Sequence, residues 1–319
     1  MRPNDYAPRP ARLKWLLDSD PAIRWQVMRD LTGETPQAIA AERSRVAVEG
    51  WGARLLALQS PVGNWGGPNE DRGLLITLNT LVVLKDLGLD PGSKQARKMI
   101  DRVDKGLVFK PLNDRPFLHG ETEPCINGRI LGIGAYFKQP NDKLANQLLT
   151  EQLEDGGWNC EAQLESPKRP KSRRSSFHTT ICVLEGLLDY ERAGRKSGAV
   201  TKARKRAEGY LLERGMFRSL RTGEVIDERW LRFSFPTFWH YDVLRGLDYL
   251  RNARIKPDSH VSDAIKVVIA RRHHNGRWPL NLLHREHIPL EIETGIGRAS
   301  RWNTLRALRV LRWYDNSTW

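Results

Sequence analysis

The chain has 319 residues, with 52 Lys and Arg against 38 Asp and Glu, and a formal net charge of +14 at pH 7. This length suits a single domain with a large core. No stretch reaches the roughly 18 apolar residues needed to cross a bilayer, and no apolar signal-peptide core follows Met1. The three cysteines are too few for a disulfide scaffold and favour a reducing compartment. We therefore expect a cytoplasmic protein without a transmembrane segment.

The N-terminal 50 residues predict a tight pair of helices. An apolar stretch around Trp15 to Leu17 is followed by Asp18-Ser19-Asp20-Pro21. This order places an acidic cap before a proline in the first helical position. A second apolar stretch, from Trp25 to Leu31, would form the next helix.

One spacing, Gln-x-x-x-Gly-x-Trp, recurs along the rest of the chain. It is complete in residues 59–65 and 152–158. Residues 272–278 keep the Gly and the Trp, and residues 211–217 keep the Gly and an aromatic residue. Phe117 marks a further, degenerate copy. The copies lie roughly 40 to 60 residues apart, which is room for two helices each. One such unit cannot bury its own apolar face and must stack on its neighbours. Apolar residues at helical spacing follow the copies in 74–84, 126–133, 181–187, 243–250 and 305–311.

This spacing resembles the QW repeat of the α/α toroids, which include squalene and terpenoid cyclases and protein prenyltransferase β subunits. The resemblance covers roughly residues 50–319. It implies an all-α protein with an inner ring of helices inside an outer ring, built as one domain over residues 1–319. The pair in residues 1–50 would pack on the repeats in 51–319. The resemblance also implies a funnel-shaped cavity lined by the N-terminal ends of the inner helices, but one fold hosts many functions.

Two cysteines and a histidine stand at or near the predicted starts of two inner helices. Zinc takes about four ligands from Cys, His and carboxylates. The resemblance adds that protein prenyltransferases hold zinc with an Asp-x-Cys and with a His in an aromatic-His-Thr segment. Glu123-x-Cys125 and Phe177-His178-Thr179 match these, with Glu replacing Asp. We therefore predict a zinc site, structural rather than catalytic, on Glu123, Cys125, Cys160 and His178. The alternative is that His178 is a hydrogen-bonded structural residue.

The basic residues are clustered, which favours a polyanionic partner and DNA in particular. The loop 168–174 carries five positive charges and no acid, and 202–206 carries four more. Arginines spaced three apart follow Arg298 on the last predicted helix. The alternative is a soluble surface that happens to be basic. The predicted nucleic-acid contacts are Lys168, Arg169, Lys171, Arg173, Arg174, Arg229, Arg232, Arg298 and Arg301.

Acids beside Trp and Tyr, inside a basic rim, suit a pocket that takes an extruded nucleobase. A carboxylate would activate water or stabilise a cationic sugar, and Glu70, Asp71 and Glu121 are the preferred candidates. The alternative is that such charges form salt bridges at helix ends, where the helix dipole favours them. The predicted pocket wall consists of Trp65, His119, Trp230, Trp239, His240, Tyr241 and Trp302.

Three functions remain open from the sequence. The first is a DNA glycosylase that removes a modified, flipped-out base. The second is an isoprenoid enzyme of prenyltransferase or terpene-cyclase type that binds an isoprenoid diphosphate. Against it, the chain has no Asp-x-Asp-Asp run of the kind with which squalene cyclases protonate their substrate. The third is a zinc-stabilised protein that only binds nucleic acid. An apolar aromatic cavity would favour the isoprenoid, and a polar cavity with a positive rim would favour nucleic acid.

Overall fold

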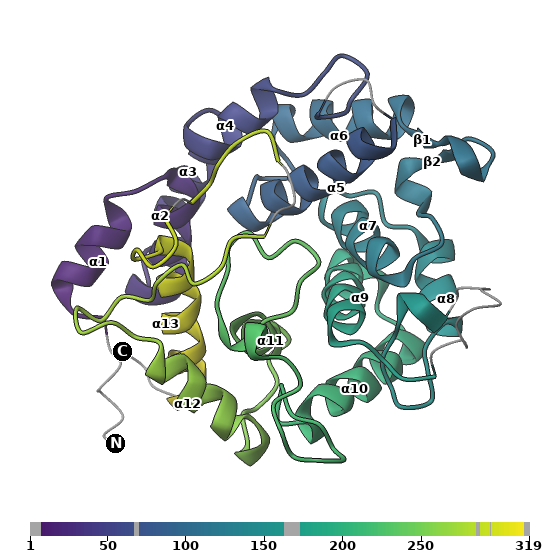
Figure 1. Cartoon of the computed structure of the whole chain (residues 1–319). Coiled ribbons are helices and arrows are strands. Elements are labelled where there is room, and N and C mark those ends of the chain that lie inside the picture. Colours follow the sequence, from purple (N-terminus) through teal and green to yellow (C-terminus); the bar gives the residue numbers. More distant parts are fainter. Residues whose placement is uncertain (1–7, 67–69, 163–172, 285–287, 294, 316–319) are drawn as a thin grey trace.

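The chain is almost entirely helical (Figure 1). A computed structural model describes residues 8–66, 70–162, 173–284, 288–293 and 295–315, except for the side chains of 70–72. No helix in these ranges is long and apolar enough to cross a membrane. The longer helices are α1 Pro10–Leu17, α2 Pro21–Val27, α3 Pro36–Ser44, α4 Gly50–Ala57, α5 Glu70–Leu87, α6 Lys94–Gly106, α7 Pro124–Tyr136, α8 Asp142–Thr150, α9 Phe177–Tyr190, α10 Gly198–Glu213, α11 Val243–Asn252, α12 Ser262–Ala270 and α13 Arg301–Asp315.

The remaining regular elements are short. Strands β1 (Val108–Phe109) and β2 (Arg115–Pro116) form an antiparallel hairpin between α6 and α7. Single helical turns occur at Met28–Thr32, Arg45–Ala47, Lys110–Leu112, Phe117–His119, Cys160–Ala162, Glu191–Arg195, Glu228–Leu231 and Ser259–Val261.

The helices form two concentric rings (Figure 1). The inner ring runs through α2, α5, α7, α9, α11 and α13, and the outer ring through α1, α4, α6, α8, α10 and α12. Neighbouring inner helices pack together, α5 on α7, α7 on α9, and α11 on α13. The apolar segments predicted from the sequence lie in α5, α7, α9, α11 and α13. The prediction of an all-α, α/α toroid is therefore confirmed.

The tryptophan of the repeated spacing joins an outer helix to the inner helix that follows it. Its indole Nε1 donates a 2.7 Å hydrogen bond to a carbonyl in the preceding outer helix, from Trp65 to Leu55, Trp158 to Leu148 and Trp278 to Val268. Its backbone N–H donates to a threonine hydroxyl on the next inner helix, Thr77, Thr180 or Thr304, at 3.0–3.1 Å. These three indoles are buried and satisfied, so their role is structural.

The glutamine and glycine of the spacing fix the turn against the next outer helix. Nε2 of Gln152 donates to the carbonyl of Gly156 at 2.7 Å and to that of Ala203 on α10 at 2.8 Å. Gln59 bridges Gly63 and Met99 on α6 in the same way. Gly156 has φ +101°, and a Cβ there would lie 2.6 Å from a backbone oxygen of α10. Glycine is required because it tolerates both the conformation and the close approach.

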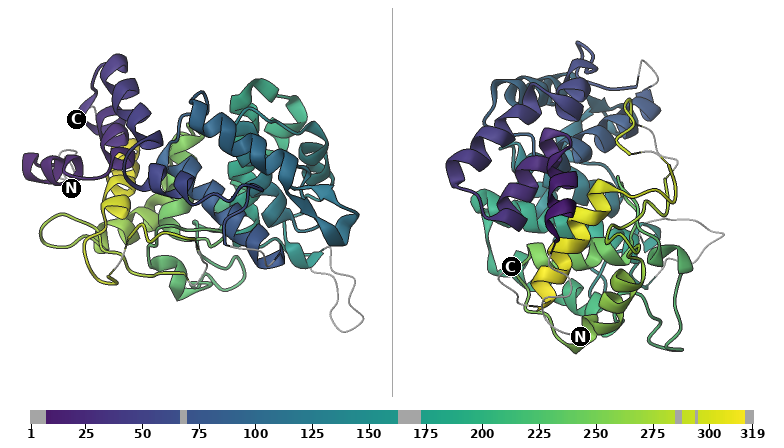
Figure 2. Two further views of the ribbon diagram at one scale, coloured as in Figure 1. Left: turned by 90° about the horizontal axis from the view of Figure 1, so that it is seen from above. Right: turned by 90° about the vertical axis from the view of Figure 1, so that its left-hand side faces the viewer.

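The N-terminal helix pair closes the ring. Asp20 caps α2 by accepting from the N–H of Ala22 at 2.8 Å, as the sequence predicts. Trp25 Nε1 donates to the carbonyl of Leu87 at the end of α5, and Arg309 of α13 donates to the side chain of Gln26. Figure 2 shows the N-terminal helices lying against α13, and α2 packs on it. The pair expected to pack on the repeats thus supplies a member of the inner ring.

Glycines allow α7 and α9 to approach closely. A Cβ on Gly186 would lie 2.1 Å from the carbonyl oxygen of Gly128, and a Cβ on Gly128 would lie 2.6 Å from that of Cys182. This contact sets the spacing of two helices that carry Tyr136, Glu185 and Asp189 of the cavity described below.

Candidate functional site

The inner helices enclose a cavity of about 370 Å³, within the range of small-molecule sites. Its wall includes Lys85 and Asp86 near the end of α5, Tyr136 at the end of α7, and Asp189 near the end of α9. Asp248 to Asn252 of α11 and Trp302 to Arg309 of α13 complete much of it. On α5, α7 and α9 the wall therefore comes from the C-terminal halves, whereas on α11 it also includes Arg245, near the start of the helix. This differs from the expected N-terminal ends, since Lys85, Asp86 and Asp189 lie in the last turns of α5 and α9.

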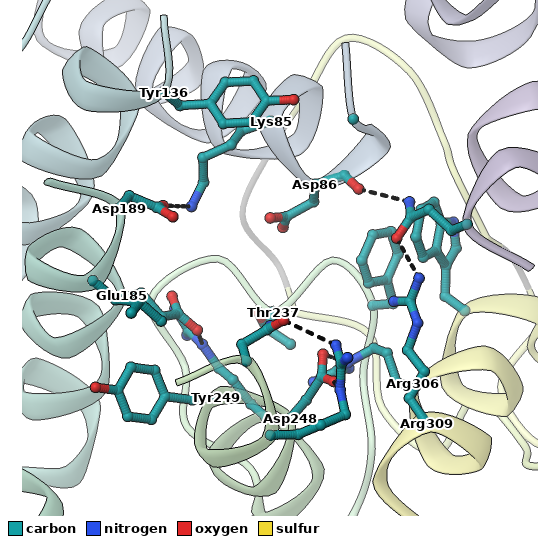
Figure 3. A pocket seen from close by; sticks show the side chains of 18 of the residues that line it. Lys85, Asp86, Tyr136, Glu185, Asp189, Thr237, Asp248, Tyr249, Arg306 and Arg309 are labelled. Carbon is teal, nitrogen blue, oxygen red and sulfur yellow. Dashed lines mark hydrogen bonds and ion pairs between the residues drawn. The ribbon is translucent and has the colours of Figure 1, made fainter. Parts of the chain in front are cut away.

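Ion pairs cross the cavity wall from helix to helix (Figure 3). Nζ of Lys85 on α5 lies 2.6 Å from Oδ2 of Asp189 on α9. Arg245 of α11 holds Glu185 of α9 with two bonds, of 2.9 and 2.7 Å. Two-bond pairing of this kind fixes both side chains in place. These pairs make the wall rigid and leave its polar atoms in defined positions.

Asp86 differs from the other acids of the wall. Its backbone oxygen accepts from Nε2 of Gln26 at 3.0 Å. Among the described residues, no hydrogen bond ends on its carboxylate, which Figure 3 shows turned toward the cavity. Burial raises the pKa of Asp86 to about 6, against the opposing effect of Lys85. A carboxyl group in this state divides between its protonated and ionised forms near neutral pH.

The cavity wall carries an excess of positive charge. Four acids line it, Asp86, Glu185, Asp189 and Asp248, against eight bases. The bases are Arg29, Arg43, Lys85, Arg192, Arg245, Arg251, Arg306 and Arg309.

Arg306 is a buried base of the wall whose ion pairs are long. Its Nη1 donates to the carbonyl of Ser234 at 3.0 Å. Its Nη2 and Nε lie 3.9 and 4.0 Å from the carboxylates of Asp242 and Asp248. These distances exceed those of a hydrogen bond, so both nitrogens retain donor capacity. The arrangement suits an anionic ligand.

A second cavity, of about 350 Å³, lies at the opposite ends of α9 and α11. His178 is the second residue of α9, and Asp189 of the central cavity follows it by 11 positions, about 16 Å along the helix. The lining includes six residues that the sequence predicts for a nucleobase pocket or its basic rim. They are Arg229, Trp230, Arg232, Trp239, His240 and Tyr241.

Three of the four predicted zinc ligands come together. The donor atoms of Glu123, Cys125 and Cys160 lie within 4.8 Å of one another. A hydrogen bond between the two thiols raises the pKa of Cys125 and lowers that of Cys160. His178 lies outside this group, and its Nδ1 accepts from the N–H of Tyr241 at 2.8 Å. His178 is thus a hydrogen-bonded residue, which was the alternative to a zinc ligand in the sequence analysis.

Of the predicted catalytic acids, Glu121 lines neither cavity. Its Oε1 accepts from the N–H of Glu123 at 2.6 Å, and its Oε2 accepts from the hydroxyl of Thr122, both in the segment just before the first turn of α7. Glu70 and Asp71 begin α5, but their side chains lie outside the described part of the structure.

The other predicted pocket residues have separate surroundings. Trp65 is buried in the first repeat turn, and His119 is exposed beside a different surface hollow. Trp302 stacks on Phe235 with ring centres 4.2 Å apart and lines the central cavity.

The predicted nucleic-acid contacts have different surroundings. Lys168, Arg169 and Lys171 lie outside these residues. Arg173, Arg174 and Arg298 are exposed, whereas Arg301 is bonded to carbonyls of Trp15 and Asp18. Arg229 and Arg232 alone border the second cavity.

Sequence reasoning missed nearly all of the central cavity. Its wall includes Lys85, Asp86 and Glu185, which sit inside the Leu-rich segments of α5 and α9. Charged residues within a helix that is apolar on most sides indicate burial toward a polar interior. That signal was available and could have identified these positions.

Comparisons with known proteins support no assignment of activity. The sequence matches no protein-family model and no curated protein sequence. Three solved structures share a likeness in fold. A protein from Actinoplanes is 16% identical, with 94% of this chain and 91% of that chain covered and a TM-score of 0.43. The type II terpene cyclase MstE from Scytonema is 14% identical over 92% and 86%, with a TM-score of 0.41. A polysaccharide lyase is 12% identical over 93% and 89%, with a TM-score of 0.46.

Proposed function

We propose that the protein is an enzyme that binds a small, polar, anionic molecule in the central cavity and exchanges a proton with it through Asp86. The observation that carries this proposal is the Asp86 carboxyl group, with a pKa of about 6, turned into a walled cavity. General acid–base catalysis is most effective when the pKa lies near the working pH. A raised pKa in a cavity is typical of catalytic groups.

The charge of the wall supports the anionic substrate. Eight bases and four acids line the cavity. Asp30 compensates part of this excess by pairing with Arg29 and Arg309, and the remainder favours an anionic ligand. Arg306 offers Nε and Nη2 to such a ligand, because no carboxylate lies closer to them than 3.9 Å. Asp86 would then act on a substrate whose anionic group is fixed by α13.

An isoprenoid enzyme stays the alternative. The rings of Trp25, Phe235 and Trp302 line the same cavity and would pack against a short isoprenoid chain, with Arg306 meeting its diphosphate. The number of charged side chains favours a polar molecule, since burying apolar groups against them forfeits much of the hydrophobic gain.

A DNA glycosylase stays a prediction from the sequence. That reaction needs a carboxylate beside the base pocket. Glu121 bonds to its chain neighbours Thr122 and Glu123, and the side chains of Glu70 and Asp71 lie outside the described residues. Two other carboxylates line the second cavity, but Asp227 is paired with Arg229 and Asp242 caps α11. The carboxylates chosen from the sequence for this reaction therefore find no support among the described residues.

Zinc also remains a proposal, at Glu123, Cys125 and Cys160. Thiolates and a carboxylate are suitable zinc ligands, and the three donor atoms lie within 4.8 Å of one another, which leaves the fourth tetrahedral position for water. A bound zinc would hold α7 to the turn Cys160–Ala162 and so stabilise the fold.

A ligand panel tests the main proposal. Glucuronate, glucose 6-phosphate, geranyl diphosphate and uncharged glucose would be added to the protein and melting temperatures recorded, because a ligand of the folded state raises Tm. Ligands that bind would then be incubated in heavy water, and deuterium incorporation or product formation followed by proton NMR. We expect the polar anions to bind, Arg306→Gln to weaken binding, and Asp86→Asn to bind without turnover. Binding by geranyl diphosphate alone would favour the isoprenoid alternative. Equal binding of glucose, or no binding at all, would contradict the proposal.

A further inference from the structure

The second cavity has the chemistry of a site for a planar ring. It lies at the N-terminal ends of α9 and α11, separate from Asp86, and its wall contains His178, Trp230, Trp239, His240, Tyr241 and His284. Its volume of about 350 Å³ falls within the range of small-molecule sites.

The rings of this cavity form an ordered stack with an edge-on partner. Trp239 stacks on His240 with centres 3.9 Å apart, and His240 stacks on His284 at 3.6 Å with 3° between the planes. His178 meets Trp239 and Trp230 edge-on, at 5.1 and 5.7 Å. Flat aromatic walls of this kind accept another planar ring by stacking or by edge contact.

His178 lines this cavity, and its ring carries a hydrogen-bond donor. Its Nδ1 accepts from the N–H of Tyr241 at 2.8 Å, so in the neutral ring the proton resides on Nε2. Burial, together with His240 and Arg245, lowers the pKa of His178 to about 4, and the ring is therefore neutral at pH 7. A neutral imidazole that donates from Nε2 can bond to a ring nitrogen or carbonyl oxygen of a ligand.

Basic side chains border the same cavity. Arg229 is exposed and bonded to Asp227, with Nη2 and Oδ2 2.6 Å apart. Arg232 is exposed and also lines the cavity. A ligand whose ring enters among the aromatic residues would place an attached anionic group near these arginines.

We propose that this cavity binds a nucleotide, with its base among the aromatic walls, a hydrogen bond from Nε2 of His178 to the base, and its phosphate at Arg229 and Arg232. A free nucleotide and a nucleotide unit in a single strand offer the same groups. The site does not depend on Asp86 and goes beyond the function proposed for the central cavity.

Titration calorimetry tests the proposal with AMP, GMP, CMP and UMP, and with ribose 5-phosphate as the probe that lacks a base. All titrations use the Arg306→Gln background, in which the anion site proposed for the central cavity is weakened. We expect at least one nucleotide to bind at least tenfold more tightly than ribose 5-phosphate. His178→Asn keeps an acceptor for the N–H of Tyr241 but removes the Nε2 donor, and it should weaken nucleotide binding about fivefold to tenfold. Arg232→Gln should weaken it severalfold and reduce its salt dependence.

Matched variants separate a site from general attraction to a basic protein. Lys98→Gln removes one charge from an exposed position of α6 and should leave binding unchanged. A single-stranded DNA octamer distinguishes a strand from a free nucleotide as the natural ligand. If it binds more tightly than the mononucleotides and responds in the same way to His178→Asn, the ligand is a nucleotide unit of a strand. Equal or weaker binding of the octamer would identify the free nucleotide.

Three results would overturn the proposal. They are no nucleotide binding, equal binding of ribose 5-phosphate, or unchanged binding in His178→Asn with its melting temperature preserved. If His178→Asn does not fold, Trp239→Phe and Trp239→Leu provide the second test. Binding should follow the aromatic area and fall from Trp to Phe to Leu, and equal affinities in the three proteins would also overturn the proposal.

Discussion

Nζ of Lys85 on α5 lies 2.6 Å from Oδ2 of Asp189 on α9, and the next residue of α5 is Asp86. Although burial alone lowers the pKa of Lys85, the carboxylates of Asp189 and Asp86 raise it above its usual value. Lys85 thus stays charged at neutral pH. Its charge acts on Asp86 in turn and limits the rise in the pKa of that carboxyl group.

Removing this charge should raise the pKa of Asp86 further. In Lys85→Met the burial of Asp86 persists while the opposing ammonium is lost, so the midpoint should move above 6. The variant should also lose about 1–3 kcal/mol of stability, because Asp189 keeps only Arg192, at 3.9 Å, as a partner. Carboxyl NMR measures the midpoint and urea unfolding measures the stability. Lys98→Met on α6 is the control, and an unchanged midpoint in Lys85→Met would show that Lys85 does not act on Asp86.

Asp86 should make the protein less stable as the pH rises. Its pKa is 3.8 in its usual state and about 6 in the folded protein, so between these values the folded state binds more protons than the unfolded chain. Stability therefore falls from about pH 4 to above pH 6, by about 3 kcal/mol when ionisation is complete. Asp86→Asn mimics the protonated group. It should be more stable than the wild type at pH 8, by up to that amount, and equal to it at pH 4.

Asp248 provides the control of opposite sign in the same cavity. Burial raises the pKa of its carboxyl group, but Arg251 and Arg309 outweigh this effect and hold the pKa below the usual value. Its ionised form therefore stabilises the fold above pH 4, and Asp248→Asn should be less stable than the wild type at pH 8. If both Asn variants lose stability at pH 8, Asp86 is an ordinary paired carboxylate.

The glutamines of the repeat turns should contribute measurably to stability. Gln59→Ala and Gln152→Ala each remove two hydrogen bonds from carbonyl oxygens, and we expect each to lose about 1–3 kcal/mol in urea unfolding. Gln95→Ala, at an exposed position of α6, should change the stability by less than about 0.5 kcal/mol. Equal effects in all three variants would mean that these bonds carry no net stability.

Metal analysis tests the cluster of Glu123, Cys125 and Cys160. We expect zinc in the purified protein, with Cys125→Ser and Cys160→Ser lowering both zinc content and melting temperature. Cys182→Ser is the matched control, because Cys182 is buried and its Sγ donates to the carbonyl of Trp239. His178→Asn should retain zinc. Wild-type protein free of zinc, prepared without chelators, would refute the proposal.

The fold could be predicted because its repeated motif is local in the sequence. The central cavity could not be predicted, because its residues are far apart along the chain. The bonds of Trp65 and Gln59 lie within one repeat or reach the next one, so a short motif reports them. The environment of Asp86 depends on Glu185, Asp189 and Arg306, which are about 100 to 220 positions later in the chain. No local sequence pattern predicts that these residues surround one cavity. The second cavity could be predicted in part. Its residues Trp230, Trp239, His240 and Tyr241 are close in sequence, and the sequence predicts them for one pocket.

The central claim is that Asp86 holds an exchangeable proton near neutral pH. Its carboxyl carbon can be followed by carbon-13 NMR in protein labelled at aspartate, with Asp86→Asn assigning the signal. We predict a midpoint of about 6 in the free protein. A midpoint near 4 would mean that Asp86 is fully ionised at neutral pH, and would contradict its role as a proton donor in the central cavity.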